Sequence, residues 1–192
     1  MLVLGSRLLN LPIMGLQTGT ELAYTRSALI NPYNLVVAAY EVGGPLIGNK
    51  LTFLRAADIR ELSSAGFIVD SSDEFISLED VVAINKIYNL GFQLINLAVI
   101  DNKKHRLGKV IDYTVEVGNL IIQQLNIQRP FLKSFGDTEL LIHRSQIIEI
   151  NNSHVVVRSG EQKPEPVRQV AKTYSNPFRN STAPVENINT NN

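Results

Sequence analysis

The densest group of charged side chains in the sequence is the segment Asp101–Arg106 (DNKKHR). Lys103, Lys104, His105 and Arg106 lie where we expect the tip of a hairpin, so several cations could meet phosphates or an acidic protein surface there. The same charges could instead serve a solvated turn that keeps a strand edge from pairing. No aromatic residue is interleaved in the cluster, which weakens the case for single-stranded nucleic acid. These four side chains are the candidate binding residues.

Two other patterns bear on metal binding. The acidic stretch Asp70–Phe75 (DSSDEF) lacks the alternating oxygen ligands and the glycine of a calcium loop, and its charges fit the start of a helix better. His105, His143 and His154 are far apart in sequence and lack the HExxH or i, i+4 spacing of a zinc site. We therefore expect neither a bound metal nor a cofactor.

The sequence also carries little that indicates catalysis. Gly43–Lys50 (GGPLIGNK) has two glycines at phosphate-loop spacing, but its lysine is displaced by one residue and Leu51 stands where Ser or Thr is needed. GxSxG elements and dinucleotide fingerprints do not occur, and the absence of cysteine excludes thiol catalysis and thiolate metal sites. We expect a protein that is not an enzyme. A catalytic pair of carboxylates that are close in space but distant in sequence stays open as an alternative.

Composition narrows the class of partner. The 192 residues include 18 basic and 18 acidic side chains, so no global field favours nucleic acid or an anionic membrane. The apolar N-terminal stretch is interrupted by Arg7, Asn10 and Pro12 and does not have the pattern of a signal peptide. No run approaches the roughly 20 apolar residues that span a membrane. We expect a cytoplasmic protein without a transmembrane segment.

The elements that would position these residues occur twice. Three segments recur in the same order at nearly constant spacing, which favours an internal duplication. The matched pairs are Leu8–Ile13 with Leu94–Val99, Asn34–Val37 with Asn119–Ile122, and Ala57–Asp70 with Ser145–Arg158.

Each half has the pattern of short strands joined by tight turns. Apolar residues after Leu107 alternate with a period near two, as in a half-buried strand. Val117–Leu120 predicts a hairpin turn, because Gly118 and Asn119 tolerate positive φ, and Pro32 presets the equivalent turn in the first half. About five or six such strands in each half indicate a small twisted barrel.

The connector and the C-terminal segment differ from the repeats. Ser77 followed by Asp80 resembles a capping box, and Leu78–Asn89 has apolar residues at helical spacing. Residues 159–192 are poor in apolar side chains, which predicts a disordered tail that could carry a recognition motif. The predicted organisation is repeat 1 at 1–76, a connecting helix at 77–91, repeat 2 at 92–158 and a disordered tail at 159–192.

The second half resembles the PRC-barrel family. Val99–Ile127 has a strand, an acidic turn, Leu-Gly-Lys-Val, an aspartate and a turn into the next strand, and Ser145–Val157 resembles the closing strands. In the first half Leu22–Ser27 (LAYTRS) replaces Leu-Gly-Lys-Val-Ile-Asp, so the resemblance is weaker there. The family includes the cytoplasmic domain of the photosynthetic reaction-centre H subunit and the C-terminal domain of the ribosome-maturation factor RimM.

The resemblance implies a mainly β chain of two tandem small PRC-like β-barrels joined by a short α-helix. It also implies a non-enzymatic binding or assembly module, an adaptor for a protein or ribonucleoprotein partner, with Lys109 and Asp112 in structural roles. Two alternatives stay open. One is association with RNA or the ribosome through the basic tip, and the other is a small-ligand or enzymatic cleft between the barrels.

Overall fold

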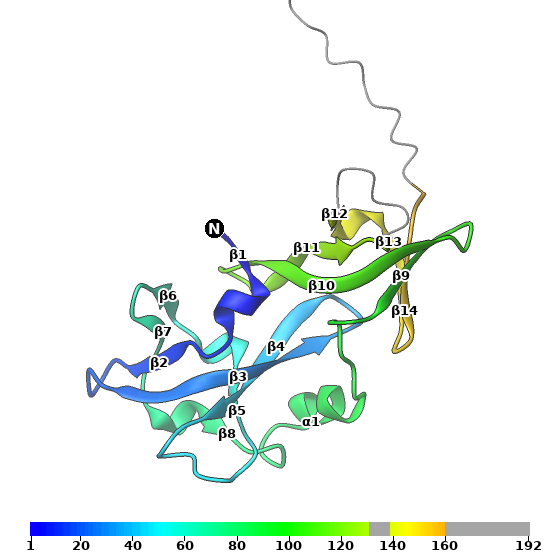
Figure 1. The fold of residues 1–192 in the computed structure, drawn as a ribbon. Helices are drawn as coiled ribbons and strands as arrows, with labels where there is room; N and C mark the ends of the chain where they lie inside the picture. Colours follow the sequence, from blue (N-terminus) through cyan, green and yellow to red (C-terminus); the bar gives the residue numbers. More distant parts are fainter. Residues whose placement is uncertain (131–138, 160–192) are drawn as a thin grey trace, which may run out of the picture. The chain divides into compact units, whose positions relative to one another are not determined.

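The computed structural model describes residues 1–130 and 139–159, and within these ranges the chain is mainly β with one α-helix (Figure 1). Its 14 strands form one hydrogen-bonded network within a compact unit, Met1–Ser159. The expectation of a mainly β chain is confirmed. The predicted disordered tail lies outside the described residues, apart from Ser159. No helix in the described part of the chain is long and apolar enough to cross a membrane.

The first half holds eight strands and three short 3₁₀ helices. These elements are β1 (Leu2–Leu4), η1 (Gly5–Leu8), β2 (Pro12–Gly15), β3 (Glu21–Asn31), β4 (Val36–Gly43), β5 (Thr52–Arg55), η2 (Ala56–Asp58), β6 (Glu61–Ser63), β7 (Gly66–Val69), η3 (Ser72–Glu74) and β8 (Phe75–Ile76). The helix and the second half follow. Their elements are α1 (Val82–Asn89), β9 (Ala98–Asp101), β10 (Arg106–Glu116), β11 (Ile121–Gln128), β12 (Glu139–His143), η5 (Arg144–Gln146), β13 (Ile147–Ile150) and β14 (His154–Val157).

The two halves share one chain path. In each, four antiparallel strands (β2–β5 and β9–β12) lead through a 3₁₀ helix into a hairpin (β6–β7 and β13–β14). The last strand of each hairpin then runs parallel to the first strand of its half. β3 and β10 both have 11 residues, and their ladders with β4 and β11 are broken by register shifts at matching places. The order and pairing of these strands therefore recur in the two halves.

The hairpin turns lie where the sequence predicts them, but the unusual backbone angle is on a different residue. Leu120, with φ of 51°, and its counterpart Leu35, with φ of 53°, adopt the left-handed conformation, whereas Gly118 and Asn119 do not. This angle is costly for leucine. Both side chains are buried in the core, and their burial offsets the strain.

β4 and β11 meet at the junction of the two halves. The Val37 N–H donates to the Leu120 carbonyl at 3.0 Å, and the Ile122 N–H donates to the Leu35 carbonyl at 2.8 Å. Equivalent residues of the two halves therefore exchange reciprocal hydrogen bonds, as across an approximate two-fold axis.

The halves also share one apolar core. A single cluster of buried side chains includes Val37 and Phe67 from the first half and Ile122 and Tyr113 from the second. The ring of the fully buried Tyr40 lies 5.4 Å from that of Phe67. Burial raises the pKa of the Tyr40 hydroxyl, and the nearby Tyr113 raises it further. The two halves therefore do not enclose independent interiors.

Helix α1 begins at Val82, four residues later than the sequence predicts. The Ser77 N–H donates to the Asp80 carboxylate at 2.6 Å, and the Asp80 N–H reaches the Ser77 carbonyl at 3.3 Å. These bonds close a turn before the helix, because the Asp80 side chain reaches back to Ser77. No side-chain hydrogen bond from Ser77 caps the start of the helix.

Helix α1 packs on the first half. Its buried Ile84 contacts Ala39 and Phe53, and the rings of Phe53 and Tyr88 meet edge to face with centroids 5.7 Å apart. Side-chain packing therefore holds the helix against the first half.

Candidate functional site

The predicted basic tip forms the turn between β9 and β10. Lys103, Lys104, His105 and Arg106 are all exposed, and Lys104 has a positive φ of 66°. Among described residues, only His105 of these four lies within ion-pair distance of a carboxylate. The tip therefore presents three lysine or arginine charges to solvent.

Asp101, a residue that sequence analysis took only as part of the charged segment, organises this turn. Its carboxylate accepts hydrogen bonds from the Lys103 N–H at 2.9 Å, the His105 N–H at 2.8 Å and the Ser159 hydroxyl at 3.0 Å, and lies 3.0 Å from His105 Nδ1. Burial alone would raise the pKa of Asp101, but the hydrogen bonds from His105, Ser159 and Lys103 outweigh it and lower the pKa to about 2. The ionised carboxylate thus fixes the backbone of the tip.

We expect stability to depend on the ionisation of Asp101. Because its folded pKa is lower than its unfolded pKa, the contribution is present above about pH 4 and is lost as the pH falls toward about 2. In Asp101→Asn that contribution is missing at every pH. The Tm difference between the wild type and Asp101→Asn should therefore be largest near neutral pH and shrink on acidification, as measured by thermal unfolding at several pH values. Parallel Tm curves would contradict this.

The three histidines lie in separate parts of the fold. His143 precedes η5 and its Nδ1 accepts the Ser145 N–H at 3.2 Å, while Gln146 reaches back to the His143 N–H at 2.9 Å. His154 begins β14. Across residues 1–130 and 139–159, no group of three His, Asp or Glu side chains could hold a metal ion.

Asp112, which the resemblance to PRC barrels places in a structural role, connects the two halves. Its carboxylate accepts the Ser6 N–H at 3.1 Å and the Ser6 hydroxyl at 2.6 Å. No ion pair with Lys109 forms among the described residues. Sequence reasoning missed this bond because Ser6 lies 106 positions away.

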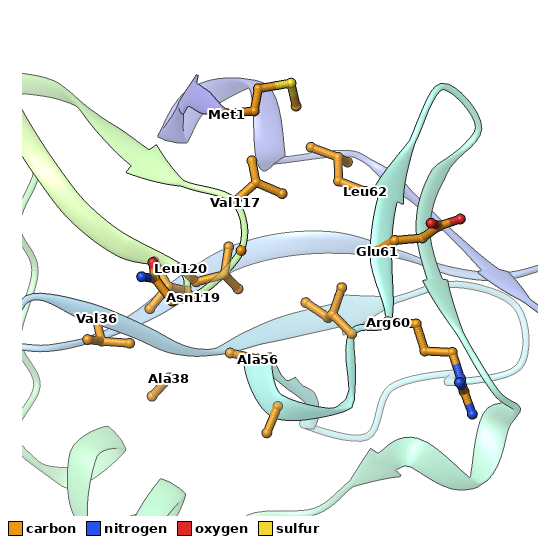
Figure 2. Close-up of a pocket in the computed structure, with 14 residues that line it drawn as sticks. Met1, Val36, Ala38, Ala56, Arg60, Glu61, Leu62, Val117, Asn119 and Leu120 are labelled. Carbon is orange, nitrogen blue, oxygen red and sulfur yellow. The ribbon is translucent and has the colours of Figure 1, made fainter.

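A hollow of about 820 Å³ lies at the junction of the two halves (Figure 2). We call it the junction groove. Its lining is mostly apolar and comes from both halves: Met1, Val36, Val37, Ala38, Ala56, Ala57, Ile59, Arg60, Glu61, Leu62, Val117, Gly118, Asn119 and Leu120. Figure 2 shows apolar side chains facing one hollow, with Arg60 pointing away from it.

The equivalent place across the approximate two-fold axis is bridged by an arginine. Arg144, the first residue of η5, donates from Nη2 to the Asn34 carbonyl at 3.2 Å. In the junction groove the first residue of η2 is Ala56, and Asn119 occupies the turn position of Asn34. The short side chain of Ala56 therefore leaves open a space that a guanidinium spans in the other half.

The two charged side chains that line the junction groove, Arg60 and Glu61, differ in whether they form an ion pair. Arg60 is held by Asp70 through two hydrogen bonds, one of them 2.6 Å from Nη2 to Oδ2. The hydrogen bond from Arg60 lowers the pKa of the Asp70 carboxyl. Glu61 is exposed and forms no ion pair with a described residue. Figure 2 shows the Glu61 side chain pointing away from the apolar side chains, as Arg60 does.

Sequence reasoning assigned no binding role to any residue of the junction groove, and it considered Val117–Leu120 only as a turn. Alanine, valine and leucine carry no chemical signature, and their convergence depends on the contact between β4 and β11. One signal was present: extending the match of Ala57–Asp70 with Ser145–Arg158 by one residue sets Ala56 against Arg144.

No protein-family model and no curated protein matches the chain. The resemblance to PRC barrels therefore depends on the residues of this chain alone.

Proposed function

We propose that this chain is a non-enzymatic binding or assembly module that holds part of a partner protein in the junction groove. The observation that carries the proposal is an open, mainly apolar hollow built jointly by the two halves. Apolar surface left exposed in a concave site is typical of a place where another molecule binds. We further propose that each half is a PRC-like barrel and that the two are fused at the junction.

The equivalent place in the other half, which Arg144 bridges, indicates the chemistry of the occupant. Arg144 spans that place and donates to a turn carbonyl. In the junction groove Asn119 occupies the turn position of Asn34, and no arginine corresponds to Arg144 there. The occupant that fits this comparison is a partner segment with apolar side chains and one arginine that takes the place of Arg144 at the turn.

Ala56→Arg should close the junction groove in the manner of Arg144 and abolish partner binding without unfolding the protein. A photoreactive side chain introduced at Leu62 would form a cross-linked product with the partner in the source cells. We expect the yield of this product to fall at least about tenfold in Ala56→Arg, which corresponds to a loss of about 1.4 kcal/mol or more in binding.

Two controls make this experiment specific. Arg144→Ala, which opens the counterpart, should leave the Leu62 product unchanged, and a photoreactive residue at the exposed Ile148 should give no product. Equal yields from Leu62 and Ile148, or a Leu62 yield insensitive to Ala56→Arg, would remove the proposal.

The basic tip supports a second candidate function, association with RNA or a ribonucleoprotein. The supporting observation is that Asp101 fixes a turn from which Lys103, Lys104 and Arg106 project into solvent. Several phosphate contacts would give a steep loss of RNA affinity with added salt, and changing all three side chains to glutamine would flatten that dependence. A small-ligand or enzymatic use of the junction groove is the third candidate, in which Glu61 would be the ionisable group free to act.

A further inference from the structure

The outer edge of β10 is covered by the N-terminal strand. Leu2, Val3 and Leu4 of β1 pair antiparallel with Glu116, Val115 and Thr114, respectively. The Val117 N–H extends this ladder by donating to the Met1 carbonyl at 3.0 Å. A strand from the first half thus completes the sheet of the second half.

The matching edge of β3 is open. Ile30 pairs with Val37 as Val115 pairs with Ile122, after register shifts at equivalent places. Because the Val37 N–H points to Leu120, on the far side from β3, Ile30 and Val37 form a pair without mutual hydrogen bonds. The backbone N–H and C=O of Ile30 therefore face the outer edge, where no described strand pairs with them.

The edge of β3 has no strand beside it because the segment of the second half that corresponds to β1 folds as helix α1. The segment before β2 is a strand followed by η1, whereas the segment before β9 is a helix. Helix α1 buries Ile84 against Ala39 and Phe53 and makes no ladder with β3. The slot used by β1 in one half is left without a strand in the other.

A groove of about 580 Å³ runs along this edge, and we call it the β3 groove. Its lining comprises Arg26–Ile30, Tyr88 and Gly91–Ile95, together with Leu9, Glu41, Phe53 and Tyr113. Tyr88 and Ile95 are 41% and 40% exposed, so apolar surface is available to an occupant. Ala28, which lines the groove, corresponds to the bulky Tyr113 of β10.

We propose that the β3 groove binds an extended peptide segment of a partner, added as an antiparallel strand to β3. The occupant resembles β1 in carrying leucine or valine side chains at successive positions, and its central residue pairs with Ile30. Its C-terminal end leaves toward Ser27, whose hydroxyl donates to Glu41 at 2.8 Å, and toward Arg26. Pairing stops at Pro32, which lacks the N–H that Val117 donates to Met1.

This inference adds a second surface to the proposed binding role and does not depend on the junction groove. It is tested with a synthetic peptide of the Met1–Leu8 sequence, MLVLGSRL, added to the intact chain. We expect saturable binding in fluorescence anisotropy and slower hydrogen exchange at the Ile30 amide. The Val115 amide, which already pairs with Val3, should exchange slowly before and after addition.

A matched peptide with Val3→Pro removes the central N–H and keeps the apolar side chains on either side. Its affinity should be at least about tenfold lower than that of the unmodified peptide. Equal binding of both peptides would show apolar adhesion only and overturn the inference. No saturable binding, or a changed exchange rate at Val115 in place of Ile30, which would mean displacement of β1, would also overturn it.

The two proposals fail independently. Ala56→Arg should leave the peptide affinity unchanged, because Ala56 lines the junction groove and not the β3 groove. If the peptide fails to bind while the Leu62 product persists, the strand-binding inference alone is wrong. If the Leu62 product is absent while the peptide protects Ile30, the junction groove alone loses its assignment.

Discussion

Gly66→Ala is expected to lower the free energy of unfolding by about 3 kcal/mol or more. A Cβ at Gly66 would lie 2.1 Å from the Pro12 carbonyl oxygen, and the φ of +123° is one that only glycine adopts readily. The obstructing atom belongs to the backbone of β2, which pairs in parallel with β7, so it cannot move without breaking that ladder. Urea unfolding of the wild type and the variant measures the difference.

Gly19→Ala is the matched control for Gly66→Ala. Gly19 also has a positive φ, of +65°, but a Cβ there would have no heavy atom within 4 Å. Its cost should be the backbone term alone, about 1 kcal/mol. If Gly66→Ala costs no more than Gly19→Ala, the close approach of β7 to β2 is not as described.

Ile122→Ala should destabilise the protein by about 3 kcal/mol, and the loss should be felt in both halves. Ile122 is fully buried at the junction, so its truncation removes apolar contacts and leaves a cavity that β4 and β11 cannot easily close. Hydrogen exchange followed by mass spectrometry in urea should show peptides of β2–β4 and β9–β11 losing protection together.

The surface variant Ile148→Ala provides the reference for this experiment. Ile148 is 53% exposed, so its truncation should change stability by no more than about 0.5 kcal/mol. Loss of protection confined to β9–β11 in Ile122→Ala would contradict a shared core.

Local patterns in the sequence located several regular elements, although the first half has eight strands where about five or six were predicted. Alternation after Leu107 predicted a strand that is β10, and Val117–Leu120 is the turn that leads into β11. Helix α1 was also found, but its start was misplaced because Asp80 closes a turn with Ser77 before the helix begins. Periodicity and turn chemistry act over a few residues, and these features depend on nothing more distant.

What the sequence could not show depends on contacts between distant segments. The pairing of β1 with β10 and the bond between Ser6 and Asp112 each join residues more than a hundred positions apart. Both candidate grooves follow from such contacts, and each becomes visible by comparing a residue with its counterpart: Ala56 with Arg144, and Ile30 with Val115. Comparing the two halves therefore shows which side chain or strand is present in one half and missing in the other.

We expect the two copies of one strand path, joined by reciprocal hydrogen bonds, to unfold as a single cooperative unit. The most direct test is native-state hydrogen exchange at the Val37 and Ile122 amides, which donate the two bonds across the junction. We predict equal opening free energies for the two amides, both matching the free energy of global unfolding. Unequal values, or exchange of either amide through an opening well below global unfolding, would contradict the claim.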